Sequence, residues 1–297
     1  MQVRELVTER RNRATEKLDT MSALEIVTAM NHEDAAVPRA IRRALPVISK
    51  AVDLVARRLA QGGRMIYVGS GTSGRIGALD ASECPPTFGV SADIVQFVIA
   101  GGERALVKAA EASEDSAELG RRDMAAKKIG RCDVVVGIAA SGFTPYTISA
   151  LEYARGEGAA TIAVACNRNS ALGKAADLAI EVEVGPEVLA GSSRLKAGTA
   201  EKLICNMLTT GAMVRLGYVY SNLMVKMHLT NRKLLQRGLA ILEVLAHVDQ
   251  ALALQTLKKA GMSVPVALVM LKTHTSRAEA VRRLRKAKGN VRRAIEG

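Results

Sequence analysis

The sequence predicts an α/β fold, a doubly wound parallel sheet, with an N-terminal helical arm and a small C-terminal helical domain. Five short apolar runs recur between residues 65 and 184 and are separated by stretches long enough to hold helices. Strands that alternate with helices in this way form parallel sheets. Aromatic residues make up only 3% of the chain and Trp is absent, so the core must be aliphatic, which suits buried parallel strands covered by helices.

The N-terminal region, residues 1–53, is expected to form the helical arm. Ser22 and Glu25 have the spacing of a capping box, which starts a helix. Residues 41–60 then carry a long apolar periodicity of the helical kind. Gly62 and Gly63 end it, and the period changes after them.

The α/β domain is expected to span residues 54–217. Its first apolar run, MIYV, ends in glycine, as buried strands often do. The five predicted strands cover residues 65–68, 94–100, 134–139, 161–166 and 178–184.

The C-terminal helical region is expected to span residues 218–297. Residues 197–216, at the end of the α/β domain, and residues 220–247 each have the pattern of a long amphipathic helix, interrupted by glycine and rich in Leu and Met. The last 50 or so residues carry glycine and proline at spacings that predict short helices.

Charge and cysteine content limit the classes of partner. Lys and Arg exceed Asp and Glu by 42 − 29 = 13, a surplus that suits nucleic acid, a membrane surface or a phosphorylated substrate. Much of the surplus lies after residue 270 at helical spacing. Because no aromatic residues stand among these charges, the pattern favours a solvated helix face over a nucleic-acid-binding site. No apolar run reaches membrane-spanning length and none resembles a signal peptide. Four cysteines without metal-ligand spacing predict reduced thiols, no metal and a cytoplasmic location.

Two loops that follow predicted strands, residues 69–75 and 140–145, combine glycines with hydroxyl groups. In an open α/β sheet, ligands bind at the carboxyl ends of the strands, and glycines there let backbone N–H groups approach a phosphate. The first loop matches GxGxxG only in spacing, and its hydroxyls suit a single phosphate ester better than a dinucleotide. Thr144 before Pro145 also fits a simple helix cap. The candidate ligands are Ser70, Thr72, Ser73, Ser141, Gly142 and Thr144.

Several segments resemble the N-acetylmuramic acid 6-phosphate etherases, a family with the sugar isomerase (SIS) fold and flavodoxin-like layers. The first is YVGSGTSGRIGALDASECPPTFG at 67–89. The others are AGGERALVKAAEASEDS at 100–116, GIAASGFTPYTISAL at 137–151, VGPEVLAGSSRLKAGTAEK at 184–202 and NLMVKMHLTNRKL at 222–234. The resemblance covers essentially the whole chain. It departs from the family at Lys226, where a smaller or acidic residue is expected.

The resemblance implies a lyase that cleaves the lactyl ether of N-acetylmuramic acid 6-phosphate with water, without a cofactor, during cell-wall recycling. It implies that Glu83 and Glu114 are the catalytic residues. Elimination across carbons 2 and 3 needs one acid and one base, and carboxylates of raised pKa can fill both roles. The apolar ECPP setting is expected to desolvate Glu83, whereas Glu114 is expected on a helix. From the residues alone, Glu83 could instead be a helix-end charge or an ion-pair partner, and Glu114 could lie on a solvated helix face.

Two further side chains and a dimer complete the expectations. Ser193 and Lys196 could close over the sugar or the lactyl carboxylate, or Lys196 could be a surface charge at a helix start.

The long apolar helices after the sheet, together with the pairing usual among SIS domains, predict a homodimer. A sugar-phosphate isomerase and a non-catalytic regulator that senses a sugar phosphate are the alternatives.

Overall fold

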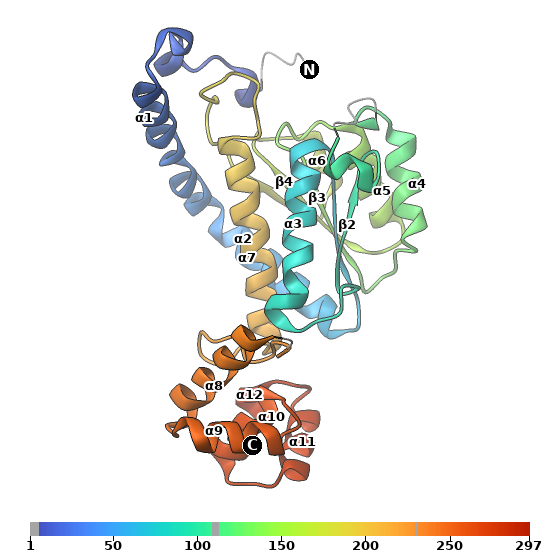
Figure 1. Cartoon of the computed structure of the whole chain (residues 1–297). Helices are drawn as coiled ribbons and strands as arrows, with labels where there is room; N and C mark the ends of the chain where they lie inside the picture. The colour runs from blue at the N-terminus through green and yellow to red at the C-terminus, as the bar shows by residue number, and fades with distance from the viewer. Residues whose placement is uncertain (1–5, 109–112, 230) are drawn as a thin grey trace. The chain divides into compact units, whose positions relative to one another are not determined.

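The computed structural model describes residues 6–108, 113–229 and 231–297, which form two compact units (Figure 1). The first unit contains the described residues up to Ser82 together with Ala92–Thr209. The second contains Glu83–Ser91 and Thr210–Gly297, so the division falls within two helices of the chain. The expected domain boundaries at 53 and 217 stay a prediction.

The N-terminal region is helical, as predicted. Ser22 caps its first α-helix: the Ser22 hydroxyl accepts a hydrogen bond from the Glu25 N–H, and the Glu25 carboxylate accepts one from the Ser22 N–H at 2.7 Å. The next helix buries one face through residues three and four apart, including Val37, Ile41 and Ile48. The elements are η2 (Val7–Glu9), η3 (Arg13–Thr15), η4 (Leu18–Thr20), α1 (Ala23–Asp34) and α2 (Ala36–Ala60).

All five predicted strands are present in one parallel sheet, which confirms the predicted fold class. They are β1 (Met65–Gly69), β2 (Val95–Ile99), β3 (Val134–Ile138), β4 (Ala160–Ala165) and β5 (Leu178–Glu181). Their order is β2-β1-β3-β4-β5, and in the register Gly69 lies opposite both Ile99 and Ile138. Since β1 and β3 are neighbours in the middle of the sheet, the chain winds away from them in both directions.

Helices cover both faces of the sheet (Figure 1). Ile66 and Val135 point to one face, where they pack in one apolar cluster with α4 (Ala117–Ala126) and α5 (Pro145–Gly156). Tyr67 points to the other face, and its hydroxyl donates to Asp80 of α3 (Gly71–Phe88) at 2.8 Å. The remaining helices of this unit are η5 (Glu103–Leu106), α6 (Ala171–Ala175) and the first part of α7 (Lys196–Leu216).

Two glycines let α3 lie unusually close to the sheet. A Cβ on Gly74 would lie 2.6 Å from Cγ1 of Ile99 and 2.8 Å from the carbonyl oxygen of Gly69. A Cβ on Gly77, one turn later, would lie 2.8 Å from Cβ of Tyr67. Neither position has room for a side chain, so glycine here sets the distance between helix and sheet.

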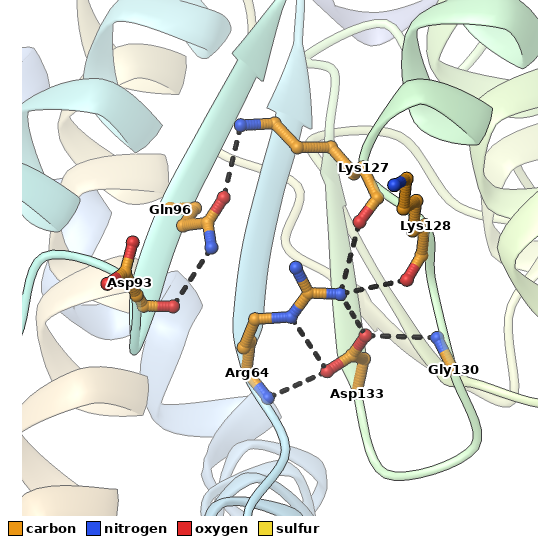
Figure 2. Close-up of polar contacts among 7 residues, drawn as sticks. All are labelled: Arg64, Asp93, Gln96, Lys127, Lys128, Gly130 and Asp133. Carbon is orange, nitrogen blue, oxygen red and sulfur yellow. Dashed lines mark hydrogen bonds and ion pairs between the residues drawn. The ribbon is translucent and has the colours of Figure 1, made fainter.

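Polar contacts join neighbouring strands at their amino-terminal ends (Figure 2). The Arg64 guanidinium donates to both carboxylate oxygens of Asp133, at 3.2 and 2.6 Å, and the Arg64 N–H donates to the same carboxylate at 2.8 Å. Burial opposes ionisation of Asp133, but the hydrogen bonds from Arg64 and Gly130 hold its pKa below the ordinary value. This pair joins the starts of β1 and β3, while the opposite edge carries the candidate ligands.

The second unit is helical, but its first long helix begins later than predicted. Residues 218–229 are not helical: Gly217 ends α7 with a positive φ of 81°, and Tyr220 forms an isolated antiparallel bridge with Leu223. The helix starts after Asn231, whose side chain accepts from the Leu234 N–H. The prediction of one helix from residue 220 is therefore wrong. The helices are α8 (Arg232–Ala246), α9 (Gln250–Lys259), α10 (Val264–Thr273), α11 (Arg277–Lys286) and α12 (Val291–Glu296).

The described residues contain no helix that is both long and apolar enough to span a bilayer. All four cysteines are described, and they form no disulfide; Cys84, Cys166 and Cys205 are buried and Cys132 is exposed.

Replacing Gly74 with alanine should destabilise the fold. The added methyl group must displace Ile99 or the Gly69 backbone, and overpacking of this kind costs about 1 to 3 kcal/mol. Denaturant unfolding measures the loss. Gly156→Ala is the matched control, since Gly156 also lies in a helix but an added Cβ would have no atom of the described residues within 4 Å. Equal unfolding midpoints for the two variants would contradict the close-packing argument.

Candidate active site

The strand order creates a switch point between β1 and β3. In sheets of this order, ligands bind beyond the carboxyl ends of the strands at the point where the winding reverses. The chain leaves β1 into residues 70–74 and leaves β3 into residues 139–144. Both loops singled out in the sequence therefore belong to the edge where a ligand is expected.

The first loop is shorter than predicted. The Ser70 carbonyl accepts a hydrogen bond from the Gly74 N–H at 3.0 Å, so α3 begins at Gly71, directly after the strand. Thr72 and Ser73 consequently lie in the first turn of the helix. Ser70 and Ser73 are each only 8% exposed, and Thr72 is half-buried. A helix start offers N–H groups without intrahelical partners, which suit an anion.

The second loop is a tight turn that requires glycine. Gly142 has φ of +75° and its N–H donates to the Ala139 carbonyl at 2.9 Å, while an added Cβ would lie 2.4 Å from Cβ of Ser170. The Ser141 hydroxyl accepts from the Phe143 N–H at 3.2 Å. Thr144 is the N-cap of α5 and Pro145 its first residue, as predicted, yet the Thr144 hydroxyl makes no capping bond. That hydroxyl is therefore available for another partner.

Glu114 is the partner of Thr144. The Thr144 hydroxyl donates to Oε1 of Glu114 at 3.4 Å, and the Tyr146 N–H donates to the Glu114 carbonyl at 3.1 Å. Glu114 lies in a turn before α4, so the prediction that it is on a helix is wrong; Ser116 starts the helix instead. These contacts bring a half-buried carboxylate to the second loop.

Glu83 is placed differently from the sequence expectation. Pro85 and Pro86 do not end α3, which continues to Phe88, so Glu83 lies on a helix in the second unit. Cys84 and Phe88 take the buried side of this last part of the helix, and Glu83 is exposed. The expectation that the apolar ECPP setting buries the Glu83 carboxylate is wrong for the described chain.

Lys196 starts α7 and is almost completely buried, at 2% exposure. Its Nζ forms an ion pair with Oε2 of Glu33, from α1, at 2.5 Å. Burial opposes ionisation of Glu33, but the hydrogen bond and charge of Lys196 hold its pKa below the ordinary value. Lys196 is therefore not a surface charge, which was the other possibility that the sequence left open.

The start of α7 lies against the start of α3. The Glu187 carboxylate accepts from the N–H groups of Lys196 and Ala197, both at 2.9 Å, and so caps α7. The Ser193 carbonyl accepts from the Gly198 N–H at 2.9 Å, and a Cβ on Gly198 would lie 3.6 Å from Cγ2 of Thr72. Ser193 and Lys196 are therefore near the first loop.

Four polar residues of this region were not singled out from the sequence. Glu33 and Glu187 hold Lys196 and the α7 start. Asn167, 3% exposed, donates from its amide to the carbonyls of Ala140 and Ser141, at 3.2 Å each. Glu201, at 0% exposure, accepts from the Ser73 hydroxyl at 2.8 Å. One signal was available: Glu201 is an acidic residue in an otherwise apolar helical pattern.

The arrangement brings together groups that could bind an anion and a carboxylate that could transfer a proton. Hydroxyls and helix-start N–H groups from β1 and β3 converge on one edge, which is the chemistry that a phosphate ester needs. Glu114 adds a carboxylate at the same edge, within reach of the second loop. A carboxylate so placed can take a proton from a carbon or return one.

Comparison with known proteins gives consistent results. The model of the glucokinase regulatory protein N-terminal SIS domain matches residues 47–155, and the SIS domain model matches residues 103–211. The chain is 49% identical to the N-acetylmuramic acid 6-phosphate etherase of Oenococcus oeni, over 99% of each chain, and 50% identical to that of Serratia proteamaculans, over 98% of each. A putative phosphosugar isomerase of Bacteroides fragilis shares the fold at 18% identity, with a TM-score of 0.52 over 70% of this chain and 98% of that one.

Replacing Glu33 with glutamine should destabilise the first unit near neutral pH. The buried Lys196 ammonium loses its carboxylate partner, which we expect to cost about 1 to 3 kcal/mol because Glu33 itself is partly exposed. The folded-state pKa of Glu33 is lowered, so its contribution is present above the ordinary pKa and is lost as the pH falls through the folded-state value. Thermal unfolding should therefore separate variant and wild type at neutral pH and bring them together in acid. The control is Glu16→Gln, an exposed position in the same region. A gap that persists unchanged in acid would count against the ion pair.

Proposed function

The chain belongs to the family of N-acetylmuramic acid 6-phosphate etherases, and from this premise we propose its reaction and the residues that carry it out. It is a carbon–oxygen lyase that cleaves the lactyl ether of N-acetylmuramic acid 6-phosphate with water. The products are N-acetylglucosamine 6-phosphate and D-lactate, and the reaction serves recycling of cell-wall amino sugars. The observation that carries this function is identity near 50% over almost the whole length of relatives with this name.

A sugar-phosphate isomerase and a silent regulator are less well supported. The isomerase of the same fold is only 18% identical, which supports the fold and not the reaction. Isomerisation also needs no acid at carbon 3. The full-length relatives at 46 to 50% identity favour the etherase over both alternatives.

The phosphate is proposed to bind at the switch point between β1 and β3. Ser70, Thr72 and Ser73 supply hydroxyls and N–H groups from the start of α3, and Ser141, Gly142 and Thr144 supply them from the second turn. The positions of these two loops at the carboxyl ends of adjacent strands support this assignment.

Glu114 is proposed to take the proton from carbon 2 of the open-chain sugar. The aldehyde at carbon 1 acidifies that hydrogen, and its removal expels the lactyl oxygen from carbon 3. Water then adds to carbon 3 of the unsaturated aldehyde, and the proton returns to carbon 2. The hydrogen bond from Thr144 supports this role, because it holds the Glu114 carboxylate beside the phosphate loop.

Glu83 is proposed to protonate the departing lactyl oxygen. This assignment rests on the resemblance of residues 67–89 to the family, since Glu83 is exposed in the described chain. Ser193 and Lys196 are proposed to contact the sugar or the lactyl carboxylate. For Lys196 this requires its ammonium to exchange the Glu33 carboxylate for that of the substrate, or to bind both.

The protein is proposed to act as a cytoplasmic homodimer. Helix α1 exposes Leu24 at 74% and Val27 at 57%, and large apolar side chains exposed together favour a protein partner. Light scattering at micromolar concentration distinguishes the dimer from a monomer. The absence of disulfides among the four described cysteines fits a reducing compartment.

Purified protein should release D-lactate from N-acetylmuramic acid 6-phosphate without added metal or nucleotide. Glu83→Gln should lower lactate release by about 10² to 10⁴, the usual contribution of a general acid. The same variant should still exchange the carbon 2 hydrogen with deuterium from solvent, because Glu114 is intact. Glu157→Gln, at an exposed position on the surface, is the control.

The other outcomes identify the alternatives. Full lactate release by Glu83→Gln would remove Glu83 from the mechanism. Ketose formation without lactate would identify an isomerase, and tight binding of the substrate without turnover would identify a regulator.

A further inference from the structure

Glu201 is a buried carboxyl group that the proposed mechanism does not use. It lies in the second turn of α7 with an exposure of 0%. Its Oε1 is 2.8 Å from the hydroxyl of Ser73, which belongs to the first phosphate loop. Its Oε2 is buried and has no hydrogen-bond partner among the described residues. A buried ionised carboxylate with a free oxygen is costly, so this arrangement calls for an explanation.

We propose that Glu201 is a positioning residue, which must carry a proton for the Ser73 hydroxyl to donate its hydrogen to the substrate's phosphate. The inference rests on the proposed function, because it takes the switch-point loops as the phosphate site. It adds a residue and a proton requirement to that site.

The argument follows from counting hydrogens. A serine hydroxyl has one hydrogen and can donate it to one acceptor. When Glu201 is ionised, its Oε1 can only accept, so the 2.8 Å contact takes the Ser73 hydrogen away from the phosphate. When Glu201 is protonated, the acid donates to Oγ of Ser73, and the Ser73 hydrogen is free for a phosphate oxygen. One proton taken from solvent by Glu201 therefore releases one donor into the site.

The surroundings of Glu201 favour the protonated form. Burial raises the pKa of Glu201 to about 8, against the smaller opposing effect of the Ser73 hydrogen bond. Among the described residues, Glu201 interacts electrostatically with the buried thiols of Cys166 and Cys205, whose pKa values are raised by burial and by nearby carboxylates, Glu201 among them. Glu187 and Asp80 act on the same thiols. None of these groups supplies a positive charge to hold Glu201 ionised.

Phosphate binding should consequently be linked to the proton on Glu201. The folded-state pKa is raised, so the binding-competent form is fully present at low pH and is lost as the pH rises through about 8. A phosphate ester is already a dianion in this range, so its own titration does not produce the loss. Above that pH, affinity should fall about tenfold per pH unit.

Calorimetric titration of the full chain with N-acetylglucosamine 6-phosphate tests this from about pH 6.5 to 9.5. Wild type should bind near pH 7 and lose about tenfold in affinity by about one unit above the pKa. Glu201→Gln should bind within about threefold of wild type near pH 7 and should not show this loss, because the amide donates to Ser73 at every pH. Glu118→Gln, an exposed glutamate on α4, should behave as wild type.

Proton uptake provides a second measurement that does not depend on the folding of Glu201→Gln. In buffers of different ionisation enthalpy near pH 8, wild type should take up about half a proton per ligand bound. Ser73→Ala should bind more weakly and take up none. If the phosphate simply repelled an ionised Glu201, the uptake would persist in Ser73→Ala, and that result would overturn the proposal.

The remaining outcomes separate this inference from the proposed function. Binding with the same pH profile in wild type and Glu201→Gln would overturn the role of Glu201 and leave the sugar-phosphate site standing. No binding of N-acetylglucosamine 6-phosphate by wild type at any pH would overturn the site and the inference together.

Discussion

The close approach of α3 to the sheet is the contact on which the candidate site depends. Gly74 and Gly77 leave no room for a side chain between the helix and Ile99 or Tyr67. The helix begins directly after β1, so Ser70, Thr72 and Ser73 lie at the carboxyl edge of the sheet with their N–H groups. The same helix continues to Phe88 and includes Glu83, which belongs to the second unit. This packing constraint therefore sets the position of the candidate phosphate loop and of the start of the helix that carries Glu83.

Polar contacts then attach α7 to α3 and complete the edge. Asp80 of α3 accepts hydrogen bonds from Tyr67 and from Asn206 of α7. In the first turn of α3, the Ser73 hydroxyl donates to Glu201 of α7. Four of these residues are buried and Asn206 is half-buried, so loss of a hydrogen-bond partner is costly. The pairing of Glu33 with Lys196 extends the network to the N-terminal arm. The edge of the sheet that carries the candidate ligands is thus supported by segments far apart in the sequence.

The sequence patterns correctly predicted the features that depend only on neighbouring residues. Buried parallel strands are continuous apolar runs, so all five were found, and the Ser22–Glu25 capping box and Thr144–Pro145 helix start depend on neighbouring residues only. The helix predicted from residue 220 failed because its apolar periodicity comes from loop residues such as Val225 and Met227, which are buried in the C-terminal core. The burial expected for Glu83 failed because Cys84 and Phe88 take the buried side of the last part of α3 and leave Glu83 on the exposed side. Glu33 and Glu187 were missed because their partners lie elsewhere in the chain, which no periodicity reports.

The central claim is that the ether is broken at carbon 3 of the sugar by elimination and water addition, with proton transfer at carbon 2. Turnover of N-acetylmuramic acid 6-phosphate in ¹⁸O-labelled water tests this most directly, with mass analysis of both products. Elimination predicts one ¹⁸O in N-acetylglucosamine 6-phosphate, at carbon 3, and none in the hydroxyl of D-lactate. Label in the lactate hydroxyl would mean that water attacks the lactyl carbon, and the roles assigned to Glu83 and Glu114 would then be wrong.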